Sequence, residues 1–432
     1  MSNANLPSSR NPPTILGAAN IVRLAYHGAD LTPLCECLQA RIDANPLDAA
    51  AFVDLALILE VSGQRALAMA AQAQALSIAQ EYTIEHGKGD GLRIVVFKAA
   101  GDLMANTPIE FLLEGSNTVL HLRYISVGTS TLDALPDHDV AFLAIGESLA
   151  NRPVLDNLPS LLAGLQGPIL NNAPGRIREL TRTGVASSLR GVSSVYAPEV
   201  TKLGRDTLRL VANRVIGSTK FLPKHRFPVI VRPFGSHAGI GMTKVNNRME
   251  LAGYLAKQQD DLFYVTEFID YAGPDGLFRK YRVAIIDGQP FASHMAISNH
   301  WMVHYLNADM EKNASRRAKE AEWMRDFDSA FAVRHASAFE ILAHRIGLDY
   351  FAIDCAEMTD GRLLLFEADV AMIVHSLDST SLFPYKKPTM QKLFDGFLRA
   401  FQRRHDHARS KAIAEHDLRA PARGVSVDEL MR

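Results

Sequence analysis

The sequence predicts an α/β protein made of a helical N-terminal part and two units that mix helices and strands. Three observations indicate this fold class. Apolar residues recur at helical spacing over residues 31–82. From Leu92 onward, short apolar runs typical of strands alternate with helical segments. Two Asp-Gly pairs, at 287–288 and 360–361, each separate two apolar runs and predict β-hairpins.

The composition excludes several classes of protein. The chain has 432 residues, of which 47% are hydrophobic and 22% charged, and this length suffices for two or three domains. Its formal net charge of −1 gives no electrostatic case for nucleic acid or an anionic membrane as a partner. No apolar run reaches the length that crosses a membrane. The three cysteines form no CxxC pattern, which suits a reducing compartment, so we expect the protein to be cytoplasmic.

The two ends are expected to lie outside the folded units. Residues 1–30 lack the apolar core of a signal peptide and are predicted to be a disordered leader. Residues 401–432 are charged and rich in alanine, and are predicted to be a helical or disordered tail.

Residues 31–84 resemble a single tetratricopeptide helical hairpin. Gly63, Ala68 and Ala75 stand where such a hairpin has its turn and its small residues, whereas Gln72 departs from the pattern. One repeat cannot bury its own apolar face. We therefore expect the hairpin to dock on the rest of the chain, on a second copy or on a peptide partner.

Residues 90–185 are predicted to form a small open α/β domain. Its runs LRIVVFK, VLHLRYI, DVAFLAI and PILN read as parallel strands. Residues 186–400 are predicted to form a second unit. Its expected elements are strands within 227–246 and at 262–269, helices near 248–257 and 328–346, and the two hairpins.

Three carboxylates lie on the strands of the second hairpin. If a two-residue turn at Asp360-Gly361 joins these strands, Asp354 falls opposite Glu367, and Asp369 shares the face of Glu367. Like charges at this separation repel, so the patch needs a counter-charge. A divalent cation such as Mg²⁺, which takes oxygen ligands, is one answer. A structural cluster neutralised by arginine is the other.

A glycine-rich loop follows an apolar strand that ends in Arg232. Gly235, Gly239 and Gly241 would let backbone amides approach an anion, as in loops that cradle phosphate. The loop joins two strands, so it is neither a Walker loop nor a Rossmann turn. A guanidinium on an otherwise apolar strand needs an anionic partner, which favours phosphate binding over a plain hairpin.

The order of these features resembles the ATP-grasp superfamily, above all its D-alanine–D-alanine ligases, glutathione synthetases and ribosomal-protein glutamate ligases. A basic strand with a glycine loop, a strand ending TEFI, the hairpin FRKYRVAIIDG and the carboxylate strands follow one another within residues 92–395. The resemblance implies an ATP-grasp fold over 186–400, preceded by the small open parallel α/β domain and the helical hairpin. It also implies ATP and Mg²⁺ as cofactors.

The resemblance assigns roles to individual residues. Asp354, Glu367 and Asp369 would hold Mg²⁺, with Asp369 standing where the family has asparagine. Arg282 and Arg232 are the catalytic candidates. Arg232 and Arg182 replace the two phosphate-binding lysines of the family. The complete set of ATP-binding candidates is Arg182, Arg232, Ser236, Gly239, Gly241, Glu267, Phe268, Ile269 and Asp270.

Residues 299–327 stand where these ligases carry a variable loop over the acceptor site. The substrate-binding candidates in this segment and after the carboxylate hairpin are His300, His304, Tyr305, Asn307 and His375. For each histidine, a structural hydrogen bond is the alternative interpretation.

The resemblance implies an ATP-dependent carboxylate–amine ligase that forms an amide through an acyl phosphate. Its substrate would be an amino acid or a peptide, and a homo-oligomer or a peptide bound to the helical hairpin would be a further partner. Two alternatives stay open: a small-molecule kinase of the same superfamily, and a non-catalytic nucleotide-binding scaffold.

Overall fold

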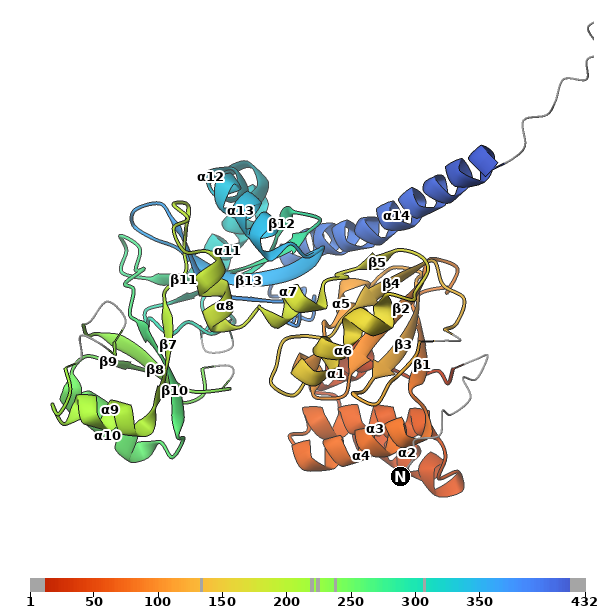
Figure 1. The fold of residues 1–432 in the computed structure, drawn as a ribbon, viewed down its shortest axis with the longest axis horizontal. Coiled ribbons are helices and arrows are strands. Elements are labelled where there is room, and N and C mark those ends of the chain that lie inside the picture. The colour runs from red at the N-terminus through yellow and green to blue at the C-terminus, as the bar shows by residue number, and fades with distance from the viewer. Residues whose placement is uncertain are drawn as a thin grey trace, which may run out of the picture.

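The computed structural model describes residues 12–132, 135–217, 221–222, 226–236, 239–305 and 308–419. Helices and three β-sheets alternate along the chain, which confirms the predicted α/β fold class (Figure 1). Within these ranges, the helices are too short or too polar for any of them to cross a membrane.

Four helices precede the first sheet: α1 (Ala18–Tyr26), α2 (Thr32–Ala44), α3 (Ala49–Val61) and α4 (Arg65–Ile78). The predicted disordered leader is therefore wrong for residues 18–26. Helix α1 is ordered because it buries Ile21 completely and because the carboxylate of Asp54 accepts hydrogen bonds from the amides of Leu16 and Gly17 before its first turn.

Helices α3 and α4 form the predicted hairpin and dock on the rest of the chain. Their apolar residues, among them Val53 and Ala75, share a buried cluster with the first sheet. Gln72, which departs from the repeat pattern, donates to the carbonyl oxygen of Gly101 and accepts from its amide. This contact with the loop after the second strand explains the polar residue at that position. Membership of the tetratricopeptide class stays a prediction.

The first sheet has the strand order β1-β3-β2-β4-β5. Its strands are β1 (Glu81–Glu85), β2 (Arg93–Ala99), β3 (Val119–Ile125), β4 (Val140–Leu143) and β5 (Ile169–Leu170). Strands β2 to β5 are parallel, as predicted, and β1 pairs antiparallel with β3. The expected helical structure is wrong at residues 81–84, because Tyr82 and Ile84 alternate into the core in the two-residue period of a strand.

Three helices connect strands of this sheet: η1 (Leu103–Ala105), α5 (Ile109–Leu112) and α6 (Arg152–Leu162). Two more, α7 (Pro174–Arg178) and α8 (Arg182–Ser188), follow it. Asn171, which follows β5, exchanges two hydrogen bonds with the backbone of Tyr350. These hydrogen bonds fix the end of the first sheet against the start of β13 (Tyr350–Glu357).

The second sheet is antiparallel, with the order β7-β10-β8-β9. Its strands are β7 (Val200–Gly204), β8 (Val229–Pro233), β9 (Thr243–Val245) and β10 (Leu262–Glu267). Helices α9 (Arg205–Ala212) and α10 (Arg248–Lys257) pack on it, and its core is a separate apolar cluster. Figure 1 shows this unit standing apart from the first sheet.

The third sheet has the order β12-β11-β13-β14-β6. Its strands are β6 (Val195–Tyr196), β11 (Phe278–Ile286), β12 (Gln289–Ser298), β13 (Tyr350–Glu357) and β14 (Leu363–Asp369). One face, with Tyr281, Val283 and Ile353, packs against helix α13 (Ala336–Ile346). The opposite face carries the polar residues described below.

The variable segment predicted at 299–327 is only partly a loop, because it contains helix α11 (Ala314–Asp326). A π-helical turn, η5 (Phe327–Phe331), and α12 (Ala332–Arg334) lead from it into α13. The last helix, α14 (Lys386–Arg419), begins on the core and projects beyond the sheets (Figure 1). The predicted tail is thus helical from 401 to 419, and the rest of it lies outside the described residues.

The two Asp-Gly turns differ. Ile286 pairs with Gln289 around Asp287 and Gly288, whose φ angles of 49° and 77° confirm a two-residue turn. In the second hairpin Glu357 pairs with Leu363, so the turn is one residue longer than predicted. A bulge on β14 then shifts the register, and Asp354 does lie opposite Glu367.

The buried carboxyl of Asp54 predicts a pH-dependent stability. Burial raises the pKa of Asp54 to about 6, so between pH 4 and 6 the folded state binds more protons than the unfolded state. The free energy of unfolding should therefore fall as the pH rises through this window, by roughly 3 kcal/mol. Denaturant unfolding of the wild type and of Asp54→Asn at several pH values tests this. The difference in unfolding free energy between the two proteins should change between pH 4 and 6. A difference that stays constant over this range would contradict the prediction.

Candidate functional site

Four polar residues lie side by side across the centre of the third sheet. His294 on β12 pairs with Arg282 on β11, Arg282 pairs with Asp354 on β13, and Asp354 pairs with Glu367 on β14. All four lie on the face away from α13, since Tyr281 and Val283, the neighbours of Arg282, point into the apolar core. We call this set the polar row.

Asp354 is the centre of the row, and its counter-charges come from β11. Oδ1 accepts from Nε of Arg282 at 2.8 Å, and Oδ2 accepts from Nζ of Lys280 at 2.8 Å and from Nη2 of Arg282 at 3.1 Å. Burial raises the pKa of Asp354, but the two cations outweigh burial and hold this pKa well below its usual range. Asp354 is therefore ionised and already paired.

Glu367 and Asp369 lie in a different environment. Nη2 of Arg182, at the start of α8, donates to Oε1 of Glu367 at 2.9 Å. Burial and the nearby carboxylates of Glu367 and Glu147 raise the pKa of Asp369 to about 7. Among the residues that the structure describes, Asp369 has no cationic partner within ion-pair distance, although the amide of Ala371 donates to its Oδ1.

Arg232 lies near the same carboxylates. Burial and the charge of Arg182 lower the pKa of Arg232 to about 10, while Glu367 acts in the opposite sense. Arg232 is thus still charged at neutral pH. It donates to the hydroxyl and the carbonyl oxygen of Ser236 and so fixes the start of the glycine loop.

The glycine loop itself requires its glycines. Gly235, Gly239 and Gly241 have φ angles of 74°, 76° and 68°, which L-residues with side chains rarely adopt. A Cβ on Gly241 would also lie 2.8 Å from the Cδ of Pro233. The loop therefore brings bare backbone close to Arg232.

Of the three predicted metal ligands, Asp354 is the one that already pairs with Lys280 and Arg282. Within the described ranges, no three His, Cys, Asp or Glu side chains are grouped so that they could hold a metal ion. For Asp354 this pairing favours the alternative of a cluster neutralised by arginine. Glu367 and Asp369 still fit Mg²⁺, because this ion commonly takes one or two protein carboxylates together with substrate phosphates and water.

The predicted adenine-binding residues lie at the end of β10. The ring of Phe268 has Nζ of Lys244 3.6 Å from its centroid and the ring of Trp301 at 5.8 Å. Glu267 accepts from the hydroxyl of Tyr196. Ile269 packs against a buried apolar cluster.

Asp270 does not join these residues. Its side chain is exposed and accepts from the amide of Ala272, so it shapes its own turn.

The substrate candidates separate into three groups. His300 is exposed, and its Nδ1 accepts from the amide of Met302. His304 and Tyr305 face the polar row. Burial and the charges of Lys280 and Arg282 lower the pKa of His304, and the ring of Tyr305 lies 4.7 Å from that of His294. Asn307 lies outside the described residues.

His375 lies beside two aromatic residues from the N-terminal part of the chain. Its ring centroid is 5.9 Å from that of Tyr26 on α1 and 6.2 Å from that of Phe111 on α5. Burial lowers the pKa of His375 to about 4, so it is neutral at neutral pH.

A polar network next to Tyr305 was not predicted from the sequence. Nζ of Lys386, at the start of α14, lies 2.7 Å from Oδ2 of Asp378 and 3.3 Å from Oε1 of Glu320 on α11. The hydroxyl of Tyr26 donates to Asp378 at 3.0 Å. Only tertiary structure joins these four residues, so no local motif could have revealed them.

The sequence did contain one signal for a missed residue. Lys280 stands two positions before Arg282, so a strand places both on one face.

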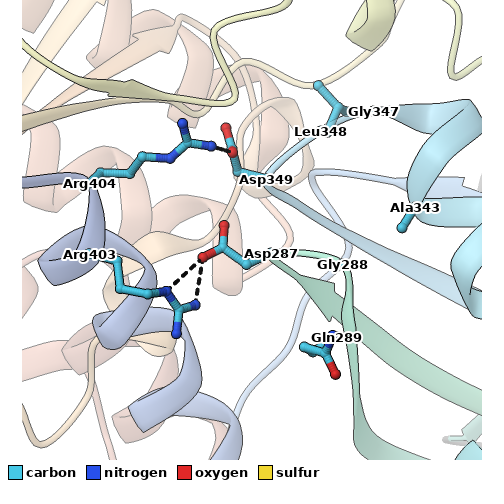
Figure 2. Close-up of a pocket in the computed structure, with 9 residues that line it drawn as sticks. All are labelled: Asp287, Gly288, Gln289, Ala343, Gly347, Leu348, Asp349, Arg403 and Arg404. Atoms are coloured by element: carbon cyan, nitrogen blue, oxygen red, sulfur yellow. Dashed lines mark hydrogen bonds and ion pairs between the residues drawn. The ribbon is translucent and has the colours of Figure 1, made fainter. Parts of the chain in front are cut away.

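An open depression lies elsewhere, between α14, the 287–288 turn and the end of α13 (Figure 2). Its two arginines are already paired, Arg403 with Asp287 and Arg404 with Asp349. It contains none of the predicted site residues, so the polar row and its surroundings are the better candidate.

Neither a protein-family model nor a curated protein matches this sequence. Solved structures do match the fold, and they are of the kinds that the sequence resembles. A RimK domain ATP-grasp protein from Sphaerobacter thermophilus is 16% identical, with a TM-score of 0.37, and the match covers 71% of this chain and 99% of that one.

Two D-alanine–D-alanine ligases match similarly. The enzyme from Bacillus anthracis, solved with ATP, is 14% identical at a TM-score of 0.39, covering 73% of this chain and 99% of that one. The enzyme from Coxiella burnetii is 13% identical at a TM-score of 0.44, covering 77% and 100%. Because these identities and TM-scores are low, the assignment of the site rests on the geometry of its residues.

The pairing of Asp354 predicts a large cost for its removal. Asp354→Ala leaves Lys280 and Arg282 buried without a counter-charge and should lower the free energy of unfolding by about 3–5 kcal/mol. The matched variant Glu367→Ala removes a carboxylate whose side chain is 36% exposed and should cost less than about 1 kcal/mol. Denaturant unfolding measures the stability of both variants. Equal losses of unfolding free energy would contradict this description of the polar row.

Proposed function

We propose that this protein is an ATP-dependent ligase of the ATP-grasp type, which joins a carboxylate to an amine through an acyl phosphate. An amino acid or a peptide is the substrate class. Residues 186–400 would carry the nucleotide, and the first sheet with its helices would form the opposite wall of the site.

One observation carries the proposal: Arg182 pairs with Glu367, and the charge of Glu367 also acts on the buried Arg232, which binds Ser236 at the start of the glycine loop. Arg182 comes from α8, Arg232 from β8 and the carboxylates from β14. A triphosphate with a divalent cation needs both kinds of group, since arginine binds phosphate oxygens and carboxylates bind the cation. A purely structural cluster would not need the bare backbone of three glycines.

The nucleotide would be held as follows. Arg182 and Arg232 bind phosphate oxygens, and Arg232 keeps Ser236 and the glycine loop in register with them. Phe268 and Trp301, with Lys244, offer aromatic and cationic surface for the base. Glu367 and Asp369 would hold Mg²⁺, and the bound ion would neutralise part of the phosphate charge.

The chemistry has two steps. A carboxylate oxygen of the substrate attacks the γ-phosphorus, the bond from that phosphorus to the bridging oxygen breaks, and ADP leaves. The amine nitrogen then attacks the acyl carbon and gives up a proton to water or a neighbouring base. Inorganic phosphate leaves with the electron pair of the broken carbon–oxygen bond. Arg282 would bind the transferred phosphoryl group, and the residues would accelerate the reaction by positioning and electrostatic stabilisation.

The substrate would lie between the polar row and the segment that carries His304 and Tyr305. His294 and His375 are neutral at neutral pH, because burial lowers the pKa of each. They can therefore accept or donate single hydrogen bonds there without repelling the nearby cations.

Incubation of the protein with ATP, Mg²⁺ and pools of amino acids and peptides tests the proposal. We expect ADP, inorganic phosphate and a product with a new amide bond, detected by mass spectrometry. A phosphorylated product would instead indicate the kinase, and tight ATP binding without turnover would indicate the scaffold.

Glu367→Gln should lower kcat by about 10²–10³-fold, because it removes a charge that organises the phosphates. The fold should persist, since this side chain is partly exposed. Steady-state ADP release and thermal unfolding measure the two effects. Glu340→Gln, on the exposed side of α13, is the matched control. Unchanged turnover in Glu367→Gln would refute its assignment.

Tryptophan fluorescence should report nucleotide binding. The chain has two tryptophans. Trp301 lies against Phe268, whereas Trp323 packs inside an aromatic cluster with Tyr281 and Phe331. A non-hydrolysable ATP analogue should change the emission of the wild type and of Trp323→Phe but not of Trp301→Phe. A full response in Trp301→Phe would show that the base binds elsewhere.

A further inference from the structure

Both carboxylate oxygens of Asp354 already accept hydrogen bonds from cationic side chains. Its side chain is 6% exposed, and three N–H groups from Lys280 and Arg282 surround its two oxygens at 2.8–3.1 Å. A divalent cation bound there would have to displace both side chains. It would then stand next to two positive charges with one carboxylate between them, and like charges at such distances repel strongly.

Lys280 and Arg282 are held in one orientation. They stand two residues apart on β11 and therefore project from the same face. Arg282 is fixed a second time, because its Nη1 donates to the carbonyl oxygen of Ile373 at 2.8 Å. The cluster of two cations and one carboxylate keeps one net positive charge at the centre of the sheet.

The same cluster faces the substrate side of the site. His294 on β12 pairs with Arg282 on β11. The lowered pKa of His304 also depends on burial and on Lys280 and Arg282. Next along the row comes Glu367, which belongs to the nucleotide side.

We propose that Asp354 is a positioning residue that clamps Lys280 and Arg282 side by side against the phosphoryl group in transfer, and that the site takes one divalent cation, through Glu367 and Asp369. This inference rests on the proposed function. The Lys280–Arg282 pair then supplies the positive charge that a second cation at Asp354 would otherwise supply. Lys280 is accordingly a catalytic residue.

The number of metal ions can be counted on the full-length protein. Mn²⁺ is titrated in the presence of a saturating β,γ-imido analogue of ATP, and bound Mn²⁺ is followed by electron paramagnetic resonance. We expect one Mn²⁺ per bound nucleotide, with the spectrum of an isolated ion. Two ions about 4 Å apart, as in two-metal sites, would give a spin-coupled spectrum and would overturn the inference.

A charge-balanced double variant avoids the folding defect of removing Asp354 alone. Lys280→Met with Asp354→Asn removes one cation and one anion together. If Asp354 is not a ligand, this variant should keep the Mn²⁺ dissociation constant within about twofold, whereas Glu367→Gln should raise it more than about tenfold. Equal losses of Mn²⁺ affinity in the two proteins would overturn the inference.

The role of Lys280 has its own readout. Lys280→Met should lower kcat by about 10²-fold while the dissociation constant of the nucleotide stays within about threefold, and Lys280→Arg should restore much of kcat. Wild-type kcat in Lys280→Met would overturn the catalytic role. A wild-type protein that binds no nucleotide would refute the proposed function as well, whereas two coupled Mn²⁺ ions on a bound nucleotide would refute only the inference.

Discussion

The ion pair between Arg282 and Asp354 is the constraint on which the site depends. Both groups lie near the middle of a five-stranded sheet, where an unpaired charge costs several kcal/mol. The pair is tolerable because Lys280 and the carbonyl oxygen of Ile373 complete its hydrogen bonds. With β12 and β14 in their own registers on either side, His294 and Glu367 lie at the two ends of the polar row.

The pair also divides the site into two sides. Toward β14, Glu367 pairs with Arg182, and Arg232 lies near Glu367 and binds Ser236. This side holds the groups that we propose bind phosphate and its cation. Toward β12, His294 adjoins Tyr305 and the buried network around Lys386. That network joins α1, α11 and α14 to the loop after β14. Helix α1 is therefore joined to the residues next to the polar row, which the sequence pattern did not indicate.

Local features were predictable from the sequence and non-local ones were not. The Asp287-Gly288 turn, helix α10 and the parallel strands of the first sheet depend on patterns within a few residues, and the predictions hold. The pairing of Asp354 with Glu367 was also predicted, but it forms through a longer turn and a compensating bulge. The counter-charge of Asp354 could not be chosen from the sequence, because Arg282 lies 72 residues away and its register depends on tertiary packing. The order in residues 18–26 was missed for the same reason, since Asp54 holds the start of α1 from a distance.

The most direct measurement is a crystal structure of the protein with a non-hydrolysable ATP analogue and Mn²⁺, with the metal located by anomalous scattering. The account predicts a triphosphate between Arg182 and Arg232, covered by the glycine loop, and metal on Glu367 and Asp369. Nucleotide bound elsewhere, for example at the arginines of α14 in Figure 2, or a crystal without nucleotide at saturating concentration, would contradict it.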